Sequence, residues 1–390
     1  MPTRELPFDV CEYKSRLVNV QTEMARAGYD ALLVLAEGSM TYLTGYEGYS
    51  DYMPQLMLVL ANHDSPILLI REMDIHCATA TTFLKNSDIE YYEEATVDLS
   101  MANVWKRLGE LAKKRIGSGR VALDPAKKAF SWEDREAFLQ GLGTSEIGSG
   151  AGWMATARRV KSPKELHYMS EAATIIDNAL SSGIAKLGVG VRECEVGAEI
   201  MHKVCLGTNG IPGGAPSFVA SIATGPIANA PHLKWSDDVF HANSQANFET
   251  GAFRHRYTCG LSRTAFIGKP SDRLKHIDAA VRESFEMTIP TLHAGNACGE
   301  VDRVFRAAFN RHGINKPSRI GYGIGIDWSD GTYTLQGGSR VALELNSTIH
   351  LIIGIWEPTE GYVFSETFRI GEHQGETFSK MPRKMFVVDA

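Results

Sequence analysis

The spacing of apolar residues changes near residue 150, and this change divides the chain of 390 residues into two halves of different architecture. In the first half, short apolar runs alternate with stretches of helical periodicity, which is typical of an α/β domain with a mixed sheet. The expected strands are 30–35, 57–60, 67–70 and 120–123, and the expected helices are 9–28, 102–114 and 132–142. The second half combines long helices with strand-like runs, which indicates an α+β domain. We therefore predict two domains, residues 1–155 and 156–390.

A strong helix start opens the second half. Ser162 stands at the N-cap, Pro163 in the first turn and Glu165 three residues after the serine, which is the pattern of a capping box. The glycine-rich segment 148–153 precedes it and makes a plausible boundary. The helices expected in this half are 164–187, 192–208, 271–293 and 299–312. The strands expected around them, in a curved and largely antiparallel sheet, are 217–223, 246–249, 251–257, 262–267, 348–355 and 363–370.

Composition excludes several classes of protein. The net charge of −6 argues against nucleic acid as the main partner, which usually selects a strongly basic surface. No run approaches the roughly 20 apolar residues that cross a bilayer, so we expect no membrane association. The stretch Met1–Glu5 lacks the apolar core of a signal peptide, which favours a cytoplasmic protein.

The six cysteines form no C-x-x-C pair, so neither a disulfide framework nor a structural zinc site is expected. Five of them are interpreted as ordinary reduced thiols. Cys259 deserves a second hypothesis, because His255 lies four residues earlier and would share its face of a strand. A histidine in that position could stabilise a nucleophilic thiolate, although a buried inert thiol is the simpler interpretation.

Five motifs in order resemble those of the creatinase, prolidase and methionine aminopeptidase superfamily. They are Lys161-Ser162-Pro163-Lys164-Glu165, Asn229-Ala230-Pro231-His232, Phe248-Glu249-Thr250-Gly251, Ser262-Arg263-Thr264-Ala265-Phe266 and Gly321-Tyr322-Gly323-Ile324-Gly325. The resemblance covers essentially the whole chain. It implies an α/β N-terminal domain of creatinase type, an α+β pita-bread catalytic domain at the C-terminal side, and a homodimer.

The positions of the superfamily's metal ligands depart from its pattern. The metallopeptidases of this superfamily bind two metal ions through two Asp, one His and two Glu. The corresponding positions here are Glu249, Gly260, Tyr322, Ile352 and Glu366. Two carboxylates cannot supply a dinuclear site, since each ion needs several protein donors and an open position for water. The resemblance therefore implies a member that has lost its metals, and we expect no metal and no other cofactor.

Among metal-free members, the chain is most similar to the ectoine hydrolases. The similarity rests on segments 39–50, 230–235 and 248–264, and on His350 and Trp356. It departs at the loop 327–332, which is shorter than in that family, and at Gly260, which replaces a proline. The resemblance implies hydrolysis of a C–N bond in a small zwitterion, with the cyclic amidine ectoine as first choice.

Three residues are candidates for catalysis. Glu249 can pair with an amidinium and act as nucleophile or as the base for water. His232 suits a proton shuttle, because an unperturbed imidazole titrates near neutrality. Glu366 can orient the amidinium or the water. The competing interpretations are a surface or hydrogen-bonding role for His232 and structural ion pairs for both glutamates, because a buried charge needs a partner.

Other side chains are candidates for substrate binding. An arginine suits the substrate carboxylate, and the sequence does not choose among Arg254, Arg256 and Arg263. Tyr322 either faces the ligand or fills the space of the lost metal ions. Aromatic side chains can surround a cation, or can equally be packing or dimer contacts. The aromatic candidates are Tyr46, Tyr52, Trp235, Trp328 and Trp356.

Three functions follow. The first is metal-independent hydrolysis of ectoine to an N-acetyl-diaminobutyrate. The second is a hydrolase or lyase of the same fold that acts on another small zwitterion, such as a creatine-like or sulfonium compound. The third is a catalytically silent relative that binds a ligand or a partner.

Overall fold

The computed structural model describes residues 4–50, 52–97, 100–124, 131–144, 146–216 and 218–390. Residue contacts divide the chain into two compact units, Met1–Ala157 and Arg158–Ala390. Among the residues described, no helix is both long and apolar enough to cross a membrane.

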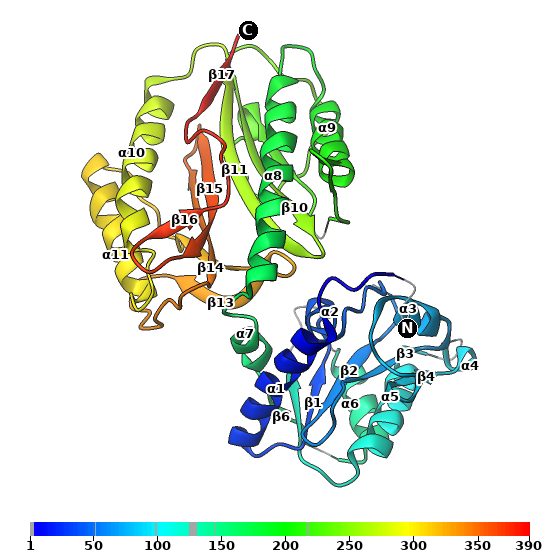
Figure 1. Ribbon diagram of the computed structural model, residues 1–390. Helices are drawn as coiled ribbons and strands as arrows, with labels where there is room; N and C mark the ends of the chain where they lie inside the picture. Colours follow the sequence, from blue (N-terminus) through cyan, green and yellow to red (C-terminus); the bar gives the residue numbers. More distant parts are fainter. Residues whose placement is uncertain (1–3, 51, 98–99, 125–130, 145, 217) are drawn as a thin grey trace. The chain divides into compact units, whose positions relative to one another are not determined.

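The first unit is built on a mixed sheet (Figure 1). Its strands follow the order β4-β3-β2-β1-β5-β6, in which β1 pairs with β2 antiparallel and with β5 parallel. Their bounds are β1 Ala31–Val34, β2 Leu56–Leu60, β3 Ile67–Arg71, β4 Ile89–Tyr92, β5 Val121–Asp124 and β6 Gly148–Ser149. The alternation of apolar runs with helices therefore predicted this α/β architecture correctly.

Helices cover this sheet. Their bounds are α1 Val10–Ala27, α2 Glu37–Thr44, α3 Ile75–Thr81, α4 Glu94–Val97, α5 Met101–Ile116, α6 Trp132–Leu142 and α7 Trp153–Ala157. Gly28 ends α1 in the left-handed region at φ 73°, where its amide caps the last turn. Val104, Leu108 and Phe138 of α5 and α6 pack with Leu33 and Leu58 of the sheet in one core. The apolar residues whose spacing predicted these helices therefore form the face that each helix buries.

The second unit contains a larger sheet in the order β13-β12-β14-β15-β11-β10-β9, with β16 beside β15 and β17 beside β11. The bounds are β9 Ser221–Thr224, β10 Ser244–Arg254, β11 Tyr257–Ile267, β12 Gly321–Ile324, β13 Ser329–Leu335, β14 Thr348–Trp356, β15 Gly361–Ile370, β16 Gly375–Thr377 and β17 Phe386–Val388. A short ladder, β7 Gly207–Thr208 with β8 Ile211–Pro212, stands apart. Pairing along the main path is antiparallel, as predicted.

The expected breaks inside the central strands do not occur. We expected separate strands at 246–249 and 251–257, but β10 runs unbroken through Gly251, and β11 runs unbroken through Gly260. The real turn is His255-Arg256, where both residues have positive φ, 47° and 66°. The expected strand at 217–223 is shorter, β9 beginning at Ser221, and Ser217 itself lies outside the described residues.

Long helices pack against one face of this sheet (Figure 1). They are α8 Pro163–Ala185, α9 Glu193–Leu206, α10 Asp272–Thr288 and α11 Cys298–Phe309. The predicted capping box of α8 is present: the Ser162 hydroxyl accepts from the Glu165 amide at 3.2 Å, and the Glu165 carboxylate accepts from the Ser162 amide at 2.7 Å.

The two faces of the sheet differ in chemistry. Apolar side chains such as Phe248, Leu261 and Leu351 enter the core beneath the helices. Because strand side chains alternate, the intervening residues project to the opposite face. These residues are largely polar or small, and they include Glu249, Ser262 and His350. The polar face is where the candidate site lies.

Candidate active site

Glu249 lies in a row of small hydroxyl side chains that crosses four strands. On β10 it is opposite Ser221 of β9 and Ser262 of β11, and Ser262 is opposite Ser365 of β15. Directly opposed residues of antiparallel strands project to the same face, so all four side chains share the polar face. The Ser365 hydroxyl donates to the Ser262 hydroxyl at 2.8 Å. The serines leave Glu249 as the one carboxylate of this row.

The Glu249 carboxylate is half-buried, and within the described part of the chain it forms no hydrogen bond and no ion pair. Burial penalises its charged form and raises the pKa of Glu249 to about 7, while the positive charge of Lys234 opposes this rise. A carboxyl group that titrates near neutrality is suited to accept a proton or to attack an electrophile.

Lys234 approaches this carboxylate from the loop after β9. Its Nζ donates to the Val219 carbonyl at 2.9 Å and to the Ser221 hydroxyl at 3.4 Å, and lies 4.7 Å from the centre of the Phe218 ring. Ser221 is the residue opposite Glu249 in the strand register. The ammonium group is therefore a close neighbour of the Glu249 carboxylate.

Helix α9 holds the loop that carries Lys234. The Trp235 ring packs on Gly197, where an added Cβ would lie 2.6 Å from the indole. Ser236 follows and donates to the Glu193 carboxylate through both its amide and its hydroxyl, each at 2.7 Å. The loop is thus anchored immediately after Lys234.

A group of four aromatic rings lies beside Glu249. Trp328 donates from its indole Nε1 to the Tyr322 hydroxyl at 2.7 Å, and its ring stacks on Phe218 at 4.4 Å. The His350 ring lies 5.2 Å from Trp328 and 5.5 Å from Tyr322. Burial and the negative charge of Glu249 raise the pKa of Tyr322, so its hydroxyl stays protonated. The group offers aromatic faces and one phenol to a ligand.

His350 is fully buried within this group. Its Nδ1 lies 3.4 Å from the Thr367 hydroxyl, and its Nε2 has no hydrogen-bond partner among the described residues. Burial lowers the pKa of His350 to about 3, because the imidazolium would lose its hydration. The ring is therefore neutral at physiological pH and adds no positive charge beside Glu249.

Two glycines make room for Trp328. Gly251 and Gly260 are directly opposed on β10 and β11. A Cβ on Gly251 would lie 2.6 Å from the Trp328 ring, and one on Gly260 would lie 2.8 Å from both Trp328 and His350. The segment 327–332, which we expected to be a shortened loop, is strand from Ser329 onward, where β13 begins. Trp328, immediately before this strand, lies over Gly260.

This crowding predicts that Gly260→Ala destabilises the protein. Trp328 and His350 are held by several partners, so the extra methyl group should lower the free energy of unfolding by about 1–3 kcal/mol. Urea denaturation measures the loss. Gly188→Ala is the matched control, because a Cβ there has its nearest contact at 3.6 Å. Equal stability of the two variants would contradict the packing described here.

The residues present do not fit the two-metal centre of the superfamily. Side chains of Trp328 and His350 fill the space beside Gly260, and the Tyr322 hydroxyl is engaged by Trp328. Ile352, opposite Ser365, brings no donor. Among the described residues, no group of three or more His, Cys, Asp or Glu side chains is arranged to hold a metal ion.

The expectation that Glu366 lies beside Glu249 is wrong. On β15 Glu366 is opposite Leu351, on the face beneath the helices, and Ser365 takes the polar face. Its carboxylate pairs with Arg263 at 2.8 Å and Arg383 at 3.0 Å, and accepts from the Thr377 hydroxyl at 3.0 Å. Neighbouring residues of a strand point to opposite faces of the sheet, so Ser365 faces the site and Glu366 does not.

The prediction that Arg263 binds substrate is also wrong, because its side chain points to the face opposite Glu249. Its guanidinium is fully buried beneath the helices, where it also donates to the carbonyls of Ser365 and Pro382 at 2.8 and 3.0 Å. Arg256 is no freer, since it pairs with Asp327 at 2.7 Å beside the turn of the β10–β11 hairpin. Neither arginine is available to a ligand at Glu249.

The remaining predicted residues lie apart from the aromatic group or are engaged elsewhere. His232 is exposed, with φ 67°, in the loop before Lys234. Trp235 packs on α9, which corrects its expected role in binding. Trp356 shares the polar face with His350 but lies over Gly354 towards the end of β14, 41% exposed. Tyr52 belongs to the first unit, where its hydroxyl accepts from Arg71 at 3.2 Å.

The thiol hypothesis for Cys259 fails. Cys259 is buried on β11, and burial raises the pKa of its thiol. His255 lies in the turn, and its ring packs at a tilt against that of Tyr168, with the ring centres 4.6 Å apart. Cys259 lies on β11, whereas His255 lies in the turn that precedes this strand. The two side chains therefore do not share a strand face.

Lys234 and His350 are two residues of this site that the sequence motifs did not point to. Lys234 stood inside the quoted segment 230–235, and His350 was quoted only as a point of similarity. The available signal for His350 was its alternation with the apolar residues 349, 351 and 353, which places it on the polar face.

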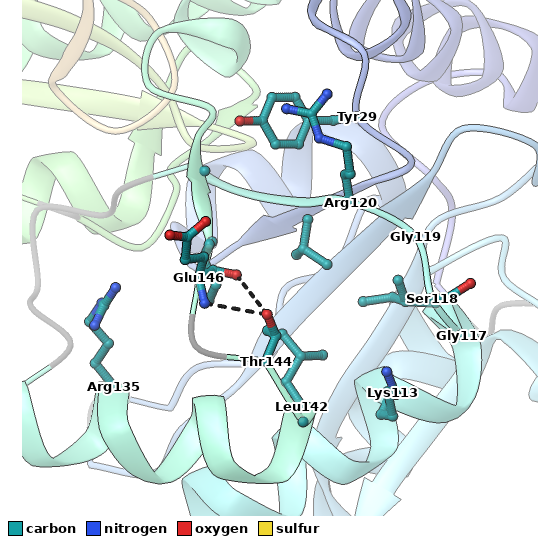
Figure 2. Close-up of a pocket in the computed structure, with 15 residues that line it drawn as sticks. Tyr29, Lys113, Gly117, Ser118, Gly119, Arg120, Arg135, Leu142, Thr144 and Glu146 are labelled. Atoms are coloured by element: carbon teal, nitrogen blue, oxygen red, sulfur yellow. Dashed lines mark hydrogen bonds between the residues drawn. The ribbon is translucent and has the colours of Figure 1, made fainter.

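A separate hollow of about 670 Å³ lies in the first unit (Figure 2). Lys113, Arg120 and Arg135 contribute positive charge to its lining. Arg120 is already engaged, since it donates to the Gly28 carbonyl at 2.8 Å and covers the Tyr29 ring at 4.5 Å. None of the predicted site residues lines this hollow.

Comparison with known proteins identifies the class. The model of metallopeptidase family M24 matches residues 167–372, and that of the creatinase/prolidase N-terminal domain matches residues 16–160. The chain belongs to family M24, and its two domains are the creatinase-type N-terminal domain and the pita-bread catalytic domain predicted from the motifs. Membership of this family, with the full-length similarity to the relatives below, makes the protein a hydrolase.

Individual relatives refine this picture. The chain is 34% identical over 384 residues to the uncharacterized hydrolase/peptidase y4tL of Sinorhizobium fredii, covering 98% of each. It is 29% identical over 394 residues to the ectoine hydrolase of Halomonas elongata, again covering 98% of each. The prolidase of Thermococcus sibiricus superposes with a TM-score of 0.84 at 18% identity, covering 96% of this chain and 99% of that one. The last likeness concerns the fold alone.

Proposed function

We propose that this protein hydrolyses a C–N bond of a cyclic amidine in a small zwitterion, with ectoine as the first candidate, and that it does so without a metal ion. The observation that carries the proposal is the carboxylate of Glu249: it is half-buried, has a pKa of about 7, lies beside aromatic rings and has no ion-pair partner among the described residues. The full-length similarity to an ectoine hydrolase supports the substrate class.

The chemistry matches the needs of an amidine. Glu249 pairs with the amidinium, and its carboxylate either attacks the amidine carbon or removes a proton from the water that attacks it. Oxygen joins the carbon, the ring C–N bond breaks and the leaving nitrogen takes up a proton. The faces of Tyr322 and Trp328 favour a cationic ring. His232 stays our prediction for the proton shuttle.

The metal-free mechanism is supported by the donor set. Gly260, Tyr322 and Ile352 replace ligands that a two-metal hydrolase requires, and Trp328 covers Gly260. The homodimer, the cytoplasmic location and the absence of nucleic-acid and membrane partners stay predictions from the sequence.

Product formation tests the proposal. Protein dialysed against a chelator is incubated with ectoine, and the reaction is followed by NMR. We expect ring opening to an N-acetyl-diaminobutyrate at a rate that added Mn²⁺, Zn²⁺ or Fe²⁺ does not increase. Turnover that appears only with added metal would contradict the metal-free mechanism. Turnover of creatine but not of ectoine would show that the substrate is another small zwitterion. Binding of ectoine without turnover would indicate a catalytically inactive relative that only binds its ligand.

A further inference from the structure

The arginines expected to bind a substrate carboxylate are all engaged by carboxylates of the protein. Arg254 pairs with Glu171 at 3.0 Å, Arg256 with Asp327 at 2.7 Å, and Arg263 with Glu366 at 2.8 Å. Arg263 also lies on the opposite face of the sheet. A zwitterionic ligand at Glu249 therefore needs another cation for its negative end.

Lys234 supplies a cation at the required place. Its Nζ donates to two neutral oxygens, the Val219 carbonyl and the Ser221 hydroxyl, and forms no ion pair with a carboxylate of the described residues. Ser221 faces Glu249 across the strand pair, and side chains in that relation have Cβ atoms about 5 Å apart. The two charges are neighbours, yet they do not close into a salt bridge.

A comparison within the same unit shows that this open arrangement is not general. Lys161 and Asp330 are both buried and form a direct pair at 2.8 Å. Glu249 and Lys234 instead remain separate, and the positive charge of the lysine only partly offsets the rise that burial causes in the pKa of Glu249. Because Glu249 and Lys234 are close but do not pair with each other, they are complementary to a ligand that carries two opposite charges a few bonds apart.

We propose that Lys234 binds the carboxylate of the zwitterionic substrate while Glu249 receives its amidinium, so that Lys234 selects substrates carrying a carboxylate. This inference rests on the proposed function. The anchors that follow Lys234, Trp235 on Gly197 and Ser236 on Glu193, hold the ammonium group over Ser221.

The test compares ectoine with the same methylated tetrahydropyrimidine ring lacking the carboxylate. For Lys234→Met we expect kcat/KM for ectoine to fall by about 10- to 100-fold, mainly through KM, because a charge-assisted hydrogen bond is lost. Activity on the ring without the carboxylate should stay within about threefold of wild type. Lys234→Arg, which keeps the charge, should recover most of the activity on ectoine.

Arg319 provides the competing cation. Its guanidinium lies 4.5 Å from the centre of the Tyr322 ring, and its side chain is exposed. We expect Arg319→Met to leave the ratio of kcat/KM for the two compounds unchanged. A changed ratio in Arg319→Met with an unchanged ratio in Lys234→Met would overturn the assignment to Lys234.

The failures are distinguishable. A Lys234→Met protein that loses the same factor on both compounds would overturn the inference and leave the proposed function standing. A wild-type protein that neither binds nor converts either compound would overturn the proposed function, and the inference would fall with it. Lys234→Gln, compared with wild type by circular dichroism, serves as a second variant if the methionine variant does not fold.

Discussion

Replacing Glu249 by glutamine is expected to reduce turnover of ectoine by about 100- to 10,000-fold, the range typical of a removed catalytic base. Glutamine keeps the size of the side chain and removes both the negative charge and the basic oxygen. Because the carboxylate has no hydrogen-bond partner among the described residues, the substitution breaks no internal contact there. Measuring kcat by NMR, with melting temperature as the folding check, separates lost chemistry from lost structure.

The pH profile gives this prediction an independent check. Attack requires the ionised carboxylate, and burial raises the pKa of Glu249 to about 7, so kcat/KM should rise with pH through a midpoint near 7. Glu199→Gln, on α9 and paired with Lys203 at 3.8 Å, is the matched control and should keep both rate and profile. An acid limb near pH 4.5, or full activity in Glu249→Gln, would refute the assigned role.

Local sequence predicted the elements of this fold well. The capping box at Ser162 and the apolar spacing after it depend on residues within a few turns of one another, and α8 begins at Pro163 as expected. The motif around Glu249 likewise identified a carboxylate that the structure places on the polar face. Such features need no knowledge of how distant segments pair.

Features that depend on pairing between distant strands were less accessible. The face of Glu366 is decided by its register with β14, and a shift of one residue would exchange it with Ser365. The role of Gly251 and Gly260 appears only when they are seen opposite each other under Trp328, nearly 70 residues further along the chain. We interpreted Gly260 as the replacement of a metal ligand, and its missing side chain also leaves the space that the Trp328 indole occupies.

The position of Lys234 beside Glu249 was also not predictable from the sequence. Arginines close in sequence to Glu249 were natural candidates, yet each has a carboxylate partner from another segment, as Arg254 has in Glu171. Lys234 lies 15 residues before Glu249 in a loop, and no periodicity predicts where a loop side chain points. Only the anchoring of this loop on α9 brings its ammonium group to Ser221.

Removing the carboxylate of Glu366 is expected to cause the largest loss of stability. Glu366→Ala should lower the free energy of unfolding by about 3–5 kcal/mol, because it leaves the guanidinium of Arg263 buried without its counter-charge. Arg263 is 0% exposed and its side chain covers the Phe364 ring at 4.4 Å, so water cannot replace the carboxylate. Urea denaturation measures this loss, and a milder loss is expected for Glu286→Ala, whose carboxylate pairs with Arg383 at the surface.

The double variant Arg263→Met with Glu366→Leu decides between structure and catalysis. If the pair only stabilises the fold, removing both charges should recover most of the stability, because apolar side chains of similar volume avoid the cost of burying ions. The recovered protein should hydrolyse ectoine at a rate close to wild type, since both residues lie on the face opposite Glu249. A stable double variant without activity would instead show that Glu366 reaches the reaction from beneath the sheet, contrary to the register of β14 and β15.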